Sequence, residues 1–426
     1  MSKKAIVQKL EEARKRTRLL LDPVSDEDLG VQHDPIMSPL VWDYGHIGNY
    51  EELWLLNRAF GISLSDRAFY DIYDASVHPR EERPSLNLLD RTDAGLYLDA
   101  VRKAAIEALD GADLGSDPLL KAGFVYNMIL QHEIQHNETM LQTLQLMPSR
   151  RYKPEPLVET PSAGEPYGEM VFVPGGSFVM GTDDYAVLDN ERDAHEVPVP
   201  DFHIDRVPVT NRAYLEFVED GGYRREELWE PDGWAWIQDQ NISLPKHWYQ
   251  PEPHNWWTQR FGYDEPLRLD HPVVHVCWYE ADAFARWAGK RLPTEAEWEK
   301  TASWDPETES KRLFPWGGEA PTTENANLDQ LAFGTSPAGA YPAGASPYGA
   351  LDMIGNVWEW TATDFTGYPG FEAFPYREYS EVFLNQGYPV LRGGSWATRP
   401  AAIRNTFRNW DLPIRRQLFV GFRCAK

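Results

Sequence analysis

The spacing of apolar positions predicts four helices in the first third of the chain. A first apolar face follows helical spacing at Ile6, Leu10, Ala13, Thr17 and Leu20. A second helix is predicted to start at Ser38-Pro39, with Ser38 as its side-chain cap, and to run towards residue 60. The third is predicted over residues 92–111 and the fourth from residue 121 to about 147. Four such helices predict a bundle, a fold whose interior suits metal ligands from facing helices.

The pattern changes after residue 150. Residues 151–168 are rich in Pro and Glu and lack periodicity, which predicts a linker between a helical domain, 1–150, and a second domain, 169–426. In the second domain, long loops rich in Gly, Pro and Trp separate short β-like segments, at 170–181, 195–210, 271–278, 389–396 and 418–423. Two helices are predicted there, at 279–288 and 294–302, the latter with a capping box of Thr294 and Glu297. This domain is therefore predicted to be α+β and rich in loops.

Composition narrows the choice of partners and compartment. The 426 residues contain 41 basic and 66 acidic side chains, a net charge of −25, which argues against binding nucleic acid or an anionic membrane. No apolar run is long enough to span a membrane, and the charged start lacks the core of a signal peptide. With only Cys277 and Cys424, no disulfide framework is indicated, so we expect a cytoplasmic protein.

The last 36 residues differ in charge from the rest of the chain. From Leu391 onward, seven arginines and one lysine stand against a single acid, Asp411, a net charge of +7. This excess favours a site for a small anionic ligand, but arginines paired with structural carboxylates elsewhere would give the same composition.

The strongest chemical signal is His132-Glu-Ile-Gln-His136 in the fourth predicted helix. Four residues advance about 400°, so both imidazoles lie on one face and can bind one divalent metal. Glu138 lies on another face, which makes His46 on the second predicted helix the better third ligand, with His33 and His78 as competitors. Imidazole ligands suit Zn, Fe, Ni and Cu alike. The same string matches the H-E-x-x-H helix of metalloproteases, so a protease remains an alternative.

A second group of candidate residues lies near the end of the chain. Tyr376 and Tyr379 form one part of it, and Asn409, Trp410, Asp411 and Arg415 form the other. Tyrosines can deliver a proton near a metal, aromatic faces can hold a quaternary ammonium, and Arg with Asp can bind both ends of an amino acid. Buried aromatics of a Trp-rich fold would give the same pattern. No phosphate-binding loop, dinucleotide fingerprint or nucleophile elbow occurs.

Several motifs together resemble known families. VPGGSFVMG (173–181), RLPTEAEWE (291–299), GNVWEW (355–360), LRGGSW (391–396) and GFRC (421–424) resemble the formylglycine-generating, or sulfatase-modifying, domain, which has a C-type-lectin-like fold. His132, His136 and Glu138 resemble the DinB-like metal-binding four-helix bundle. In this order the two domains resemble the non-haem iron sulfoxide synthases of ergothioneine biosynthesis. Further stretches typical of that family are SPLVWDYGHIG (38–48), YDASVHPR (73–80), LDNERDAHEVPVP (188–200) and FRNWDLPIRRQ (407–417).

The resemblance implies a reaction and a role for each candidate residue. It implies that His46, His132 and His136 hold iron(II), and that the enzyme uses O2 to join the sulfur of γ-glutamylcysteine to C2 of the imidazole of hercynine (N-α-trimethylhistidine), as a sulfoxide. Tyr376 would be the proton donor. The other residues would bind substrate: Arg80, Asp411 and Arg415 the thiol, Gln135 and Tyr379 the imidazole, Asn409 and Trp410 the betaine end.

The same residues also fit other functions. Free cysteine is a second possible thiol donor, and a zinc-dependent DinB-like thiol transferase or a ligand-binding module without turnover are other function classes. Formylglycine formation is disfavoured, because residues 404–410 contain no cysteine and Cys277 and Cys424 lie far apart in sequence. The oligomeric state cannot be read from the sequence.

Overall fold

The computed structural model describes residues 2–115, 117–147 and 152–426. The chain divides into two compact units, Met1–Pro154 with Asp184–Leu188, and Glu155–Asp183 with Asp189–Lys426. The predicted domain boundary at residue 150 and the first predicted linker residue, 151, lie outside the described residues. Residues 155–168, predicted as linker, belong to the second unit, where the amides of Leu157 and Val158 donate to the carbonyl of Leu331.

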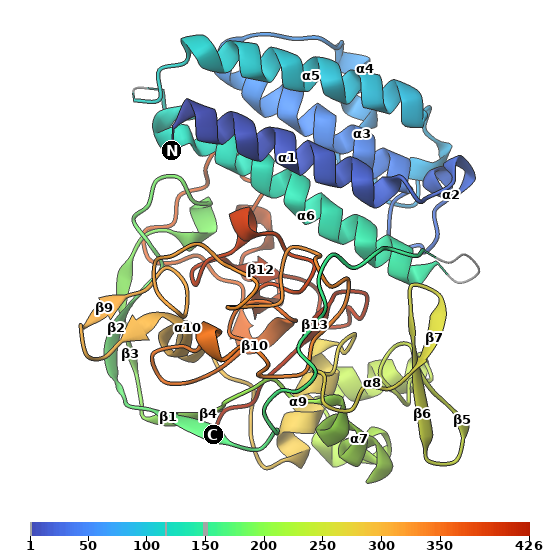
Figure 1. The fold of residues 1–426 in the computed structure, drawn as a ribbon, viewed down its shortest axis with the longest axis vertical. Coiled ribbons are helices and arrows are strands. Elements are labelled where there is room, and N and C mark those ends of the chain that lie inside the picture. Colours follow the sequence, from blue (N-terminus) through green and yellow to red (C-terminus); the bar gives the residue numbers. More distant parts are fainter. Residues whose placement is uncertain (1, 116, 148–151) are drawn as a thin grey trace. The chain divides into compact units, whose positions relative to one another are not determined.

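The first unit is a helical bundle, as the apolar spacing predicts (Figure 1). Its long helices are α1 (Lys3–Leu21), α3 (Leu40–Glu51), α5 (Arg91–Gly111) and α6 (Phe124–Leu146). The apolar face predicted for α1 is buried throughout. Shorter elements are α2 (Asp26–Gly30), a π-helix (Glu52–Ala59), α4 (Arg67–Ile72) and two 3₁₀ turns (Arg83–Ser85, Lys121–Gly123). No helix in the described ranges has the length and apolarity that crossing a membrane requires.

The start of α3 differs from the prediction. Pro39, with extended ψ of 138°, occupies the cap position, and no side chain caps the helix. The hydroxyl of Ser38 instead accepts a hydrogen bond of 2.6 Å from Arg83 Nη1. The predicted Ser38 cap is therefore wrong, because the Ser38 hydroxyl oxygen accepts from Arg83 and not from a backbone N–H of α3.

A buried ion-pair cluster joins one residue from each long helix. Arg14 of α1 contacts Glu51 of α3 at 2.8 Å and Glu133 of α6 at 2.9 Å. Arg102 of α5 contacts the same two carboxylates at 2.6 and 2.9 Å. All four side chains are buried. Because removing one partner of such a cluster typically costs about 3–5 kcal/mol, the cluster fixes how each helix is rotated, and with it which way α6 presents its histidines.

The second unit contains short strands and four helices, with long loops between them (Figure 1). The helices are α7 (Asn211–Glu219), α8 (Pro231–Asp239), α9 (Trp278–Trp287) and α10 (Glu295–Ser303). The strands are β1 (Met170–Val173), β2 (Gly176–Met180), β3 (His195–Val199), β4 (Phe202–Asp205), β5 (Trp248–Glu252), β6 (Asn255–Arg260), β7 (Tyr263–Pro266), β8 (Trp304–Asp305), β9 (Ser310–Lys311), β10 (Trp358–Asp364), β11 (Pro389–Arg392), β12 (Asn409–Trp410) and β13 (Val420–Gly421). The predicted fold class, a helical bundle followed by a loop-rich α+β domain, is confirmed.

The sheets of this unit are small. The largest among the described residues has the order β12-β11-β10-β13, with β10 and β13 parallel and the other pairs antiparallel. Residues 271–277, predicted as β-like, form no strand and make one isolated bridge, between Pro272 and Thr210. The predicted capping box of α10 is present, with Thr294 N donating to Glu297 Oε2 at 2.7 Å and Glu297 N donating to Thr294 Oγ1 at 3.2 Å.

The arginines at the end of the chain pair with carboxylates, and four of them, Arg392, Arg399, Arg408 and Arg423, are buried. Arg392 contacts Glu295 and Glu299 at 3.0 and 2.5 Å, Arg408 contacts Glu295 at 2.7 Å, and Arg423 contacts Glu359 at 2.7 Å. The remaining pairs are Arg399–Asp329, Arg404–Glu191, Arg416–Glu280 and Arg415–Asp411. All seven arginines thus have a carboxylate nearby, and structural pairing explains the four that are buried. The Arg415–Asp411 pair is longer, 3.5 Å, and half-buried, so these two residues keep surface for a ligand.

Candidate metal centre and substrate residues

Three histidines of the bundle converge on one point. His46 comes from α3, and His132 and His136 come from adjacent turns of α6. His46 Nε2 lies 3.1 Å from His132 Nε2, and one nitrogen from each of the three rings lies within 4.8 Å of the others. This arrangement fits one divalent ion bound by three imidazoles with positions left for other ligands.

The second nitrogens of two rings are engaged away from this point. His46 Nδ1 bonds the carbonyl of Tyr73 at 2.6 Å, and His136 Nδ1 bonds Oδ1 of the buried Asp43 at 3.0 Å. With each Nδ1 carrying the proton, the Nε2 lone pairs are free for a metal. The donor set and its outer hydrogen bonds therefore fit a metal ion.

Burial keeps two of these imidazoles neutral, and aromatic neighbours hold their rings in place. Desolvation, followed by the neighbouring His136, lowers the pKa of both His46 and His132 well below the usual value, which keeps their rings neutral. Trp42 stacks on His46 with centroids 4.7 Å apart, and Tyr50 stacks on His132 at 3.7 Å. These flat contacts fix the ring planes before any ion binds.

The competing histidines are engaged elsewhere. His33 Nε2 bonds the carbonyl of Asp28 at 2.9 Å, and His78 Nδ1 lies 3.2 Å from Glu82. A metal could also be held by Cys, Asp or Glu side chains. In the part of the chain that the structure describes, the one group of three or more His, Cys, Asp or Glu side chains close enough to share a metal is His46, His132 and His136.

Glu133, the residue that a metalloprotease would use as its base, is committed to the ion-pair cluster. Its carboxylate accepts from Arg14 Nε at 2.9 Å, Arg102 Nη2 at 2.9 Å and Thr17 Oγ1 at 2.7 Å. Burial opposes its ionisation, but the two guanidinium groups outweigh that effect and lower the pKa of Glu133 to about 2. So weak a base, bound on both oxygens, cannot activate water, which removes the basis for the protease reading.

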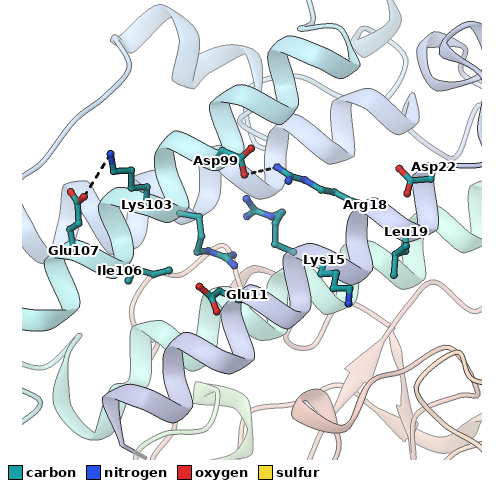
Figure 2. A pocket seen from close by; sticks show the side chains of 11 residues that line it. Glu11, Lys15, Arg18, Leu19, Asp22, Asp99, Lys103, Ile106 and Glu107 are labelled. Atoms are coloured by element: carbon teal, nitrogen blue, oxygen red, sulfur yellow. Dashed lines mark hydrogen bonds and ion pairs between the residues drawn. The ribbon is translucent and has the colours of Figure 1, made fainter.

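A cavity of about 700 Å³ in the bundle lies away from the histidines, between α1 and α5 (Figure 2). No histidine or cysteine lines it. Two pairs of its charged side chains contact each other, Arg18–Asp99 at 2.6 Å and Lys103–Glu107 at 4.0 Å. Arg14 and Arg102 instead belong to the buried ion-pair cluster. The metal chemistry of this unit is therefore not associated with this cavity.

In the second unit, the predicted aromatic residues form a connected group. The Tyr376 and Tyr379 rings are 6.1 Å apart, and Tyr379 meets the Trp410 ring edge-on at 6.2 Å. One face of Trp410 is covered by Phe365, stacked at 3.9 Å. Tyr376, Tyr379 and Trp410 are all half-buried, so each keeps surface for a ligand.

The predicted polar residues next to this group form a half-buried pair. Arg415 Nε lies 3.5 Å from Asp411 Oδ1, with side chains 17% and 25% exposed. The loop that carries them is tied to α9, where Trp278 N donates to the carbonyl of Pro413 at 3.0 Å. Asn409 and Trp410 form strand β12, paired with β11.

The two remaining candidates lie in the helical unit. Gln135 precedes His136 on α6 and is half-buried, and Arg80 is exposed on the loop that leads to the turn Arg83–Ser85. Sequence reasoning missed Trp42, Asp43 and Tyr50. Their spacing of −4, −3 and +4 from His46 places them on its face of α3 and was the available signal.

Comparisons with known proteins match both units. Residues 9–140 match the DinB superfamily, and residues 156–426 match the sulfatase-modifying factor enzyme 1-like domain. The hercynine oxygenase of Mycolicibacterium thermoresistibile is 46% identical over 99% of this chain and 94% of that protein. The hercynine oxygenase of Mycobacterium tuberculosis is 45% identical over 98% and 97% of the two chains. The formylglycine-generating enzyme of Mycobacterium tuberculosis is 38% identical, over 60% of this chain and 97% of that protein.

Proposed function

We propose a function from one premise: the chain belongs to the family of the hercynine oxygenases. It is an iron(II)- and O2-dependent sulfoxide synthase that acts on hercynine and γ-glutamylcysteine. The C2–H bond of the imidazole and the S–H bond of the thiol break, a C–S bond forms, and one oxygen atom joins the sulfur. The second oxygen atom and the two hydrogens leave as water, so the four electrons that O2 accepts come from the two substrates.

The observation that carries this proposal is the set of three imidazoles that each bring one ring nitrogen to within 4.8 Å of the others. Iron(II) held by His46, His132 and His136 would supply the one-electron chemistry with O2 that no protein side chain provides. Zinc suits the same ligands but has no redox chemistry, so the metal identity is decided by the reaction and not by the ligands.

The remaining residues bind the substrates and move one proton. Tyr376 donates its phenolic proton during oxygen activation. Arg80 and Arg415 bind the carboxylates of the thiol peptide, and Asp411 binds its amine. Gln135 and Tyr379 orient the imidazole of hercynine. Asn409 and Trp410 contact its betaine end, where the aromatic face suits a trimethylammonium group.

The test loads the metal-free protein with Fe(II) without air, then measures O2 uptake and product mass with hercynine and each thiol. We expect uptake with γ-glutamylcysteine and a product of the mass of the C–S sulfoxide. Sulfoxide formation with free cysteine alone would overturn the thiol assignment. Equal turnover of the zinc-loaded protein without O2 would make it a thiol transferase instead. His46→Ala should abolish iron binding, and His33→Ala is the matched control that should retain it.

A further inference from the structure

One sequence motif has no part in the proposed reaction. Residues 188–193, Leu-Asp-Asn-Glu-Arg-Asp, include a 3₁₀ turn, η4 (Asp189–Glu191), in the second unit. The three residues of the turn are 2%, 0% and 0% exposed, although all three side chains are polar. Buried polar groups must have hydrogen-bond partners, so the partners show what such a turn is for.

The carboxylate of Asp189 spans the two ends of the segment that carries both candidate tyrosines. Oδ2 accepts from the backbone N–H of Phe374 at 3.1 Å, and Oδ1 accepts from the hydroxyl of Ser380 at 2.5 Å. Asn190 Nδ2 donates to the same hydroxyl at 3.0 Å. Residues 374–380 form no helix or strand. Their conformation is therefore held by these side-chain hydrogen bonds and not by the backbone hydrogen bonds of a regular element.

The same turn holds the chain that leads into β12. Glu191 binds the guanidinium of Arg404 and accepts from Thr406 Oγ1 at 2.7 Å. The carbonyl of Asn190 accepts from Arg408 Nη1 at 2.9 Å. The turn Asp189–Glu191 therefore binds two segments: residues 374–380, which carry the two tyrosines, and residues 404–408, which precede Asn409 and Trp410 in the chain.

We infer that Asp189 is a positioning residue, whose carboxylate holds residues 374–380 in the one conformation in which Tyr376 can deliver its proton. The inference rests on the proposed function, since it assumes the role of Tyr376. Asp189 acts only through the segment that it fastens. A misplacement of about 1 Å costs an enzyme up to about 10²-fold in rate, so loosening either end of the segment lowers turnover and leaves metal binding intact.

The test compares Asp189→Asn and Ser380→Ala with a matched control, Asp205→Asn. Asp205 is also buried in the second unit and accepts one backbone N–H, from Cys424 at 2.9 Å, and one hydroxyl, from Tyr167 at 3.0 Å. It also pairs with Lys290 Nζ at 2.5 Å, so its variant loses at least as much as Asp189→Asn. It makes no bond to residues 374–380 in the described structure, so its variant reports on the general loss of a buried carboxylate. Hydrogen exchange at the Phe374 amide and steady-state kinetics are measured on the full-length, iron-loaded protein.

We expect exchange at Phe374 to be at least about tenfold faster in Asp189→Asn and Ser380→Ala than in the control. Their kcat for sulfoxide formation falls about 10–10²-fold with KM for the thiol and iron content unchanged, and more of the thiol is dioxygenated without C–S bond formation. Full kcat in both variants, despite faster exchange, overturns the inference, as does an equal loss in Asp205→Asn. A fully active Tyr376→Phe would instead refute the proposed role of that tyrosine, which separates the two failures.

Discussion

Replacing Asp43 by Asn tests how the metal centre is built. Asp43 is 1% exposed, and its Oδ1 bonds His136 Nδ1 at 3.0 Å, which orients the ring and makes Nε2 a better donor. The amide keeps an acceptor oxygen but loses the negative charge. Outer partners of metal-bound histidines typically contribute 10–100-fold in metal affinity, or about 1.4–2.7 kcal/mol. Because the carboxylate is buried and the bond is charge-assisted, we expect a loss near the upper end, about 100-fold.

Anaerobic titration with Fe(II) against a competing chelator measures this loss directly. The matched control is Asp99→Asn, which removes a carboxylate of the same unit whose side chain is 59% exposed and bound to Arg18. Its dissociation constant should equal that of the unmodified protein. An unchanged dissociation constant for Asp43→Asn would show that Asp43 does not support a ligand, and the assignment of His136 to the metal would lose its structural basis.

Three further predictions concern catalysis and stability. Tyr376→Phe should slow sulfoxide formation by about 10²–10⁴-fold while iron stays bound, measured by product formation and metal content. Burial opposes ionisation of Glu299, but Lys311 and Arg392 outweigh it and lower the pKa of its carboxyl from 4.5 to about 2. Glu299→Gln should therefore lose about 3 kcal/mol in urea unfolding at pH 7, a difference that shrinks as the pH falls from about 4.5 towards 2. Burial raises the pKa of Asp352 from 3.8 to about 6. The unfolded chain therefore loses this proton at a lower pH than the folded protein does, which destabilises the fold as the pH rises from about 4 to about 6. Stability should fall by up to about 3 kcal/mol as the pH rises from 4 to 6, and Asp352→Asn, which keeps an acceptor for Gly339 N–H, should abolish that fall in thermal unfolding.

The sequence predicts best what short-range periodicity determines. The long helices of the bundle repeat an apolar face every three or four residues, so their positions follow from the chain itself. The pairing of His132 with His136 is likewise a property of one helix. A local sequence pattern does not predict which residues pair over long distances in the chain. Arg423 and Glu359 are 64 residues apart, and nothing near either one distinguishes a core ion pair from a ligand site.

The loop-rich unit shows the same limit from the other side. Residues 271–277 alternate like a strand, but the amide of Val273 bonds the carbonyl of Val209 and that of His275 bonds the carbonyl of Val420, instead of forming a continuous ladder. The role of Asp189 is equally hidden, because its partners Phe374 and Ser380 lie about 190 residues further along the chain. Segments of this kind take their conformation from tertiary contacts, and only the folded structure reveals them.

In the proposed function, three imidazoles of the bundle hold iron for an oxygenation that links carbon to sulfur. The most direct test supplies the Fe(II)-loaded protein with hercynine, γ-glutamylcysteine and isotopically labelled O2, and determines the product by mass spectrometry. We expect a sulfoxide bonded at C2 of the imidazole, with one labelled oxygen atom on sulfur. A product without labelled oxygen, or the same product from a His132→Ala variant that binds no iron, would contradict it.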